Sequence, residues 1–194
     1  MKYYIGWVNG VGKWSIISSL LDYPNTFHYQ GSSILMKKLW LPEGDYKNLR
    51  ALERKYKDDM FEEAIWEILT GIEQSADPKA MHLFDAHYLN LVEWNIFNAC
   101  NQQIISNMDC LVLVTADTKE VLTRIQKDVF RDRKLFTTQE FDPDIYTHYI
   151  NQTTLTAKQL AQAYNKSFLE IRNPEWGLNQ AVEQLMMYHK SQIK

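Results

Sequence analysis

The chain has 194 residues, a length that suits one domain with a sizeable core. Hydrophobic residues make up 45% and charged residues 23%, as in ordinary globular proteins, and a formal net charge of −3 argues against general coating of nucleic acid. No apolar stretch approaches the roughly 20 residues that a membrane span needs, and no signal-peptide pattern is present, so we expect a cytoplasmic protein.

Strand and helix patterns alternate along the chain, which predicts an α/β fold with a mainly parallel sheet. The expected strands, in chain order, are 3–8, 26–29, 80–84, 111–114 and 167–171. The expected helices are 13–21, 31–40, 46–74, 91–105, a segment after 117, 144–165 and 181–189. The two cysteines, Cys100 and Cys110, form no metal-binding spacing and are expected to be reduced, packed thiols.

The first expected strand leads into Gly-Trp-Val-Asn-Gly-Val-Gly-Lys-Trp-Ser, residues 6–15. A glycine-rich turn lets backbone N–H groups converge on phosphate oxygens, and the helix that follows directs its positive dipole end at the same anion. The pattern predicts a phosphate-binding loop in which Lys13 reaches the β and γ phosphates. The predicted nucleotide contacts are Asn9, Gly10, Val11, Gly12, Lys13, Trp14 and Ser15.

This loop departs from the usual phosphate-binding pattern at two positions. Trp7 stands where the pattern has its first glycine, and Trp14 stands where it has a serine or threonine. Ser15 supplies a hydroxyl one residue later, so we expect it to help hold Mg²⁺. The alternative is a glycine-rich turn in which Lys13 is solvated.

The apolar run at 80–84 ends in Asp85-Ala-His87. A carboxylate at the carboxyl end of a parallel strand lies where α/β proteins bind ligands, so Asp85 is the predicted Mg²⁺ ligand. The alternative role for Asp85 is to cap the helix expected after it. For His87 we expect a packing role rather than that of a base.

A basic segment follows the fourth expected strand, where Arg124, Lys127 and Arg131 are spaced by three and four residues. This spacing places them on one helical face, and arginine forks bind phosphate oxygens through paired hydrogen bonds. Arg124, Arg131 and Arg133 are therefore predicted to stabilise charge on the transferring phosphoryl group. Residues 127–143 are predicted to form a lid that excludes water. A solvated basic helix paired with neighbouring aspartates is the alternative.

Together these motifs resemble the archaeal-type adenylate kinases, within the wider group of nucleoside-monophosphate kinases. The likeness runs nearly end to end and rests on the order of Gly10-Val-Gly-Lys13, Asp85-Ala-His87, Thr115-Ala-Asp117, Arg124 with Arg131-Asp-Arg133, and Asn173 to Gly177 before a last helix. The resemblance implies a P-loop NTPase fold of the nucleotide-kinase type, in which a five-stranded parallel sheet is flanked by helices and a short lid. It also implies ATP and Mg²⁺, with Asn173 and Gly177 near the adenine.

By the same resemblance, the chain is expected to be one kinase-like domain that transfers the γ-phosphoryl group of ATP to a small molecule. A nucleoside monophosphate is the first acceptor to consider, with 30–75 as the acceptor-binding helical region. In that family an arginine after the Asp-x-His helps to hold the monophosphate, whereas 88–94 contains none. Arg50 or Arg54 is the candidate substitute.

Two alternative functions stay open. One is a nucleotide-binding regulatory module with little catalysis, which the two tryptophans flanking the loop, Trp7 and Trp14, and the altered acceptor segment favour. The other is a P-loop kinase of a non-nucleotide metabolite with a hydroxyl acceptor, for which Asp85 is the candidate base.

Overall fold

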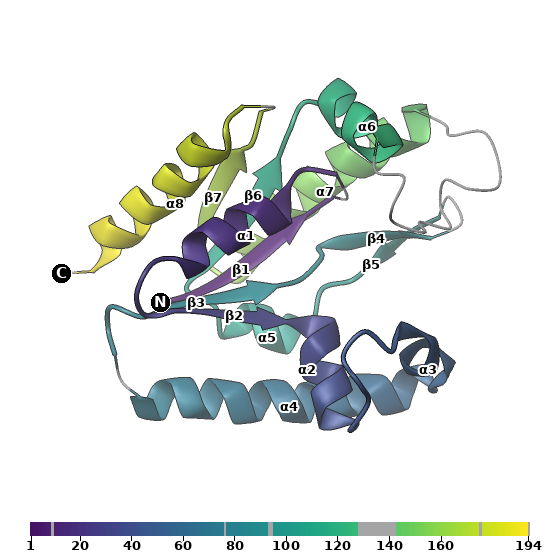
Figure 1. The fold of residues 1–194 in the computed structure, drawn as a ribbon, viewed down its shortest axis with the longest axis vertical. Helices are drawn as coiled ribbons and strands as arrows, with labels where there is room; N and C mark the ends of the chain where they lie inside the picture. The colour runs from purple at the N-terminus through teal and green to yellow at the C-terminus, as the bar shows by residue number, and fades with distance from the viewer. Residues whose placement is uncertain (9, 76, 93–94, 128–142, 175, 194) are drawn as a thin grey trace.

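The computed structural model describes residues 1–194 except 9, 76, 93–94, 128–142, 175 and 194 (Figure 1). The strands are β1 Lys2–Trp7, β2 Thr26–Gln30, β3 Met81–Asp85, β4 Leu89–Val92, β5 Asn95–Asn98, β6 Cys110–Thr115 and β7 Ser167–Arg172. The helices are α1 Lys13–Leu21, α2 Gly31–Lys38, α3 Tyr46–Ala51, α4 Arg54–Ser75, α5 Gln102–Ser106, α6 Thr118–Lys127, α7 Pro143–Ala163 and α8 Leu178–Gln192.

Five of these strands form one parallel sheet in the order β2-β3-β1-β6-β7. The predicted fold class, a five-stranded parallel sheet flanked by helices, is confirmed. β1 lies at the centre, and Ile5 on β1 pairs with Asp85 on β3. The loop that follows β1 and the carboxylate that ends β3 therefore emerge side by side at the carboxyl edge of the sheet.

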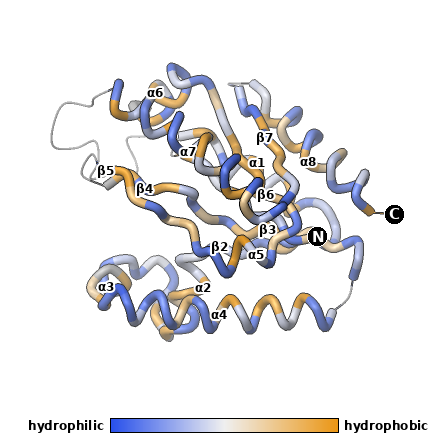
Figure 2. The backbone as a smooth tube through the Cα atoms, turned by 180° about the vertical axis from the view of Figure 1, so that it is seen from behind, coloured by the Kyte–Doolittle hydropathy of each residue, from blue (hydrophilic) through white to orange (hydrophobic). Residues whose placement is uncertain are grey.

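Alternate residues of the central strand face opposite layers of helices, as the pleat of a strand requires. Tyr3 and Ile5 pack in one cluster with residues of α1 and α8, whereas Tyr4 packs in a second cluster with residues of α4, α5 and α7. Figure 1 shows α1 on one side of the sheet and α5 on the other, with α4 along the lower edge. Figure 2 shows α4 alternating between hydrophilic and hydrophobic residues, as expected of a helix with one buried face.

The expected helix 46–74 is two helices, α3 and α4, separated by an extended residue, Leu52 (ψ 147°). Helix α2 packs along α4, and its Leu35 and Met36 form a small third cluster with Leu49 of α3. α2 stands beside β2, the edge strand of the sheet, and α2 and α4 border a cavity that is described below.

The helix expected at 91–105 was wrong. Its first part contributes to an antiparallel hairpin of β4 and β5, in which Leu89 pairs with Asn98. Leu89 and Leu91 are buried with a polar residue between them, which is the two-residue period of a strand, and Tyr149 of α7 donates to the Leu89 carbonyl at 2.9 Å. Among the described residues of this segment only those of α5 are helical, and the Asn101 side chain caps α5 by accepting from Ile104 N at 3.1 Å.

Of the predicted lid, 127–143, residues 128–142 lie outside the described part of the chain. Among the residues that the structure describes, no helix combines the length and the apolar character needed to cross a membrane.

Candidate active site

The loop between β1 and α1 has the backbone conformation that its glycines predict. Gly10 and Gly12 are both left-handed, with φ of 87° and 81°. A Cβ on Gly12 would lie 2.6 Å from Nδ2 of Asn173, and one on Gly10 would lie 2.8 Å from Cγ1 of Ile125. Gly12 is also the N-cap residue of α1 and makes no side-chain cap. The first turn of α1 therefore begins without a side-chain acceptor at its cap, as in helices whose N-termini bind phosphate.

Lys13 lies at the start of α1 and binds Asp85 across the edge of the sheet. Its Nζ donates to Asp85 Oδ1 at 3.0 Å and to Oδ2 at 2.8 Å. The same ammonium lies 3.5 Å from the centroid of the Trp7 ring, which is 3% exposed. The tryptophan that replaces the first glycine of the pattern thus forms a floor under Lys13, and its ring favours a positive charge there.

Asp85 is 7% exposed and also contacts a residue that the sequence interpretation missed. Nε2 of His28, on β2, lies 3.2 Å from Asp85 Oδ2. β2 runs parallel to β3, and His28 pairs with Leu83, two residues before Asp85. The signal that could have found His28 is its place near the carboxyl end of an expected strand, the edge at which Asp85 was expected.

His87, two residues beyond Asp85, packs against Trp7. Its ring centroid lies 5.0 Å from that of Trp7. Burial, followed by the positive charge of Lys13, lowers the pKa of His87, so its ring is neutral. Its buried Nδ1 has no hydrogen-bond partner within the described residues.

Arg124 and Asn173 tie the glycine loop to the far side of the sheet. The Arg124 guanidinium donates from Nη1 to the Val11 carbonyl at 3.2 Å and from Nη2 to the Asn173 carbonyl at 3.1 Å. Asn173 is buried, and its Nδ2 donates to the same Val11 carbonyl at 2.7 Å. Gly177, four residues later, is the N-cap residue of α8. In this state Arg124 and Asn173 brace the loop, and their contact with ATP stays a prediction.

The remaining predicted residues divide into two groups. Trp14 and Ser15 lie on the exposed side of α1, and the Trp14 ring stands edge-on to the His28 ring at a centroid distance of 5.4 Å. Asn9, Arg131 and Arg133 lie outside the described residues, so their predicted roles stay predictions.

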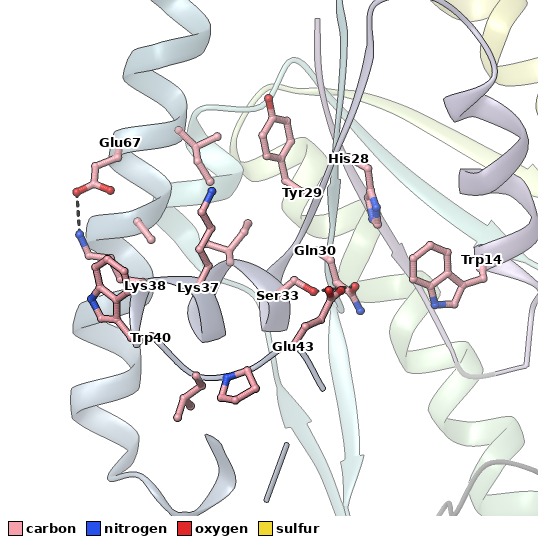
Figure 3. A pocket seen from close by; sticks show the side chains of 15 residues that line it. Trp14, His28, Tyr29, Gln30, Ser33, Lys37, Lys38, Trp40, Glu43 and Glu67 are labelled. Carbon is pink, nitrogen blue, oxygen red and sulfur yellow. Dashed lines mark hydrogen bonds and ion pairs between the residues drawn. The ribbon is translucent and has the colours of Figure 1, made fainter. Parts of the chain in front are cut away.

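A cavity of about 1150 Å³ adjoins this cluster on the β2 side (Figure 3). Trp14 of α1 and His28 of β2 line one end of it, and the rest of β2, α2, α4 and the turn after α2 supply the remaining lining. Lys38 on its wall is bound to two carboxylates of α4, at 2.7 Å to Glu67 and 3.2 Å to Glu63. The described lining contains lysines, glutamates and aromatic rings, and no arginine.

No protein-family model matches the chain, and no curated protein sequence matches it. Several solved structures are similar to it in fold. A shikimate kinase from Bacteroides thetaiotaomicron is similar with a TM-score of 0.54 and 11% identity, over 97% of each chain. A shikimate kinase from Aquifex aeolicus is similar with a TM-score of 0.54 and 12% identity, over 98% of this chain and 97% of that one.

The chain shares the fold of these two structures, a five-stranded parallel sheet flanked by helices. At such identities the likeness concerns the fold alone. The resemblance to archaeal-type adenylate kinases in particular stays a prediction from the sequence.

Proposed function

We propose that the chain is an ATP-dependent phosphotransferase that acts on a small molecule. The observation that carries the proposal is the pair of Lys13 and Asp85 at the carboxyl ends of β1 and β3, 2.8 Å apart. The pair stands between a glycine loop of phosphate-binding shape and a large cavity. Phosphoryl transfer needs mainly positioning and fixed positive charge, and this arrangement offers a donor side and an acceptor side that adjoin.

The donor set suits Mg²⁺, which takes one or two protein oxygens together with phosphate oxygens and water. Asp85 and Ser15 would hold the ion, which would neutralise charge on the phosphates. Both oxygens of Asp85 lie within 3.0 Å of Lys13 Nζ, so they are already occupied by the ammonium. Lys13 must therefore turn from Asp85 toward the phosphates when nucleotide binds. The negative phosphates would attract the Lys13 ammonium, and its departure would free the Asp85 carboxylate for Mg²⁺.

Once turned, Lys13 would stabilise negative charge on the transferring group, in a direct in-line transfer without a phospho-enzyme. Arg124 is held 3.2 Å from the Val11 carbonyl of the loop and would add a second positive charge near the phosphates. Arg131 and Arg133 would complete this set.

For the acceptor, a nucleoside monophosphate is the first candidate, because the sequence resembles nucleotide kinases. Most residues that line the cavity belong to 30–75, the region proposed to bind the acceptor. A non-nucleotide hydroxyl compound is the second candidate. The observation that favours it is the described lining, which has no arginine and whose Lys38 is already bound to Glu63 and Glu67.

A nucleotide-binding module with little catalysis is the rival from another class. Trp14 in place of the usual hydroxyl and the closed pair of Lys13 with Asp85 favour it. The rival predicts ATP binding without turnover.

The test is ADP release from Mg²⁺-ATP with each of a panel of acceptors: AMP, CMP, UMP, shikimate and small polyols. We expect turnover with at least one acceptor and a loss of at least about 100-fold in Lys13→Met. Lys158→Met is the matched control, because Lys158 pairs with Glu170 (3.3 Å) on the surface. ATP binding with no product from any acceptor would establish the module instead, and absence of ATP binding would overturn both.

A further inference from the structure

Trp40 is a side chain that the chemistry of the glycine loop does not use. It is 94% exposed, the most exposed large hydrophobic residue among those described. No ring contact or cation–π contact is formed by Trp40 within the described residues. Single exposed hydrophobic residues are common on proteins, so exposure alone carries no conclusion.

The backbone of Trp40 adds a second, independent feature. Its φ is 57°, in the left-handed region that bulky residues avoid. The residue closes α2, with Trp40 N donating to the Lys37 carbonyl at 3.2 Å and Leu41 N to the Met36 carbonyl at 2.9 Å. Glycine or asparagine would close the helix in this way without steric cost. A tryptophan here is unfavourable in the free protein on two counts, which points to a role in binding.

The position of Trp40 gives that role a site. Trp40 lines the 1150 Å³ cavity together with Trp14 and His28. Figure 3 shows Trp40 and Trp14 at opposite ends of the lining, with Gln30, Ser33 and Glu43 between them. One end of the cavity is thus lined by Trp14 and by His28, whose Nε2 lies 3.2 Å from Asp85 Oδ2, and the other end is an exposed indole.

Ion pairs within the protein hold the part of the cavity wall beside Trp40. Lys38 stands next to Trp40 in Figure 3, and its ammonium is bound by Glu67 and Glu63 of α4. Lys38 therefore has its charge satisfied within the wall, and the indole face remains available to a flat apolar group. Stacking on an indole is favourable for any aromatic ring and needs no matching charge.

We propose that Trp40 is a ring-binding platform and that the acceptor carries a planar aromatic ring. The ring would stack on Trp40, and the group that accepts the phosphoryl group would lie at the other end, beside His28 and Asp85. That the bound molecule is a phosphoryl acceptor rests on the proposed function, whereas its aromatic ring is inferred from Trp40 itself.

The test uses the whole chain with its six tryptophans replaced by 5-fluorotryptophan, so that each gives one ¹⁹F resonance. Single Trp→Phe variants assign the resonances. The donor site is first filled with AMP-PNP and Mg²⁺. Two matched pairs of probes follow: benzyl alcohol against cyclohexylmethanol, and adenosine against ribose. We expect both aromatic probes to shift the Trp40 resonance and their ring-free or saturated counterparts to leave it in place.

Trp66 is the internal control, since it is half exposed on α4 but lies outside the cavity lining. Its resonance should not move. In affinity measurements, Trp40→Gly should weaken adenosine binding roughly 5- to 100-fold, and Trp40→Phe should weaken it less. Trp66→Phe should leave it unchanged, and none of the three variants should alter AMP-PNP binding.

The outcomes separate the two ideas. If AMP-PNP binds but no aromatic probe shifts Trp40, or if cyclohexylmethanol and ribose shift it equally, the inference is wrong and the proposed function stands. Unchanged adenosine affinity in Trp40→Gly would overturn the inference as well. If AMP-PNP itself does not bind, the proposed function fails first, and the acceptor site falls with it.

Discussion

The loop after β1 and the cavity beside β2 are neighbours built in opposite ways. In the loop, polar groups meet partners inside the protein: Lys13 binds Asp85, and the Val11 carbonyl accepts from both Arg124 and Asn173. In the cavity, Trp40 extends into solvent from a left-handed backbone. The loop is braced before any nucleotide binds, whereas Trp40 on the cavity wall is left exposed to solvent.

Substitutions in the two regions should therefore have different effects. A change in the loop removes contacts that already stabilise the folded chain, so it should reduce stability as well as activity. A change at the exposed end of the cavity removes little from the folded chain and should act on binding alone. Four experiments, in order of decreasing expected effect, test this contrast.

Lys13→Met should have the largest effect on stability. It leaves the Asp85 carboxylate, 7% exposed, with His28 as its remaining partner among the contacts described above. Removing one member of a buried ion pair costs about 3 kcal/mol or more. Urea unfolding measures this free energy. The double variant Lys13→Met/Asp85→Asn should recover most of the stability and none of the phosphotransfer, and equal stability of wild type and Lys13→Met would show that the pair does not brace the loop.

Gly12→Ala should destabilise the chain more than Gly44→Ala. Both residues are left-handed, with φ of 81° and 84°, so each alanine costs about 1 kcal/mol for its backbone conformation. A Cβ at Gly44 meets nothing within 4 Å, whereas one at Gly12 would displace Asn173 Nδ2 from the Val11 carbonyl. The lost buried hydrogen bond should add a further 1–2 kcal/mol or so, again by urea unfolding. Equal losses would mean that the Asn173 brace contributes nothing.

His82 lies on β3, where it pairs with Phe27 of the edge strand β2, and it should make stability depend on pH. It is buried between Phe27 and Tyr29, and burial lowers its pKa to about 4. Between pH 6.5 and about 4 the unfolded chain binds this proton and the folded chain does not, so stability falls as the pH falls through that window. Folded His87 and His189 also have lowered pKa values and act in the same direction.

The measurement is the free energy of unfolding from pH 7 to pH 4 for wild type and His82→Asn. Asparagine keeps a polar group near the Tyr29 hydroxyl, which lies 3.1 Å from His82 Nδ1. The variant should lose up to one proton of the uptake on unfolding, and therefore show a shallower slope. An unchanged slope would assign the dependence to the other two histidines.

Much of the fold could be predicted from local patterns. The five strands of the sheet have apolar runs between turn residues, and each predicted strand lies within two residues of its observed bounds. Gly10, Gly12 and Lys13 predicted the loop because the signal is local: two glycines that can be left-handed and a lysine at the start of a helix. The position of Asp85 at the carboxyl edge of the sheet was predicted from its place at the end of an expected strand.

The parts that could not be predicted depend on tertiary neighbours. The segment from Leu89 to Asn98 has apolar residues that suit a helix or a hairpin, and the contact of Tyr149 with the Leu89 carbonyl accompanies the hairpin. His28 meets Asp85 only through the register of β2 against β3. Trp7, interpreted from the sequence as a departure from the phosphate-binding pattern, packs its ring against the ammonium of Lys13. Sequence spacing does not record such pairings, because they join residues far apart in the chain.

The smallest effect is expected at Trp40, and its sign is the informative part. The ring is 94% exposed, so Trp40→Gly removes almost no packing from the folded chain. Glycine relieves about 1 kcal/mol of left-handed strain and returns part of it through the greater entropy of the unfolded chain. We expect stability between unchanged and about 1 kcal/mol higher. Trp66→Gly, in the middle of α4, should instead lose at least about 1 kcal/mol through helix propensity alone. If Trp40→Gly destabilised the chain as much as Trp66→Gly, the indole would already be packed in the free protein, and the contrast between a braced loop and a waiting platform would fail.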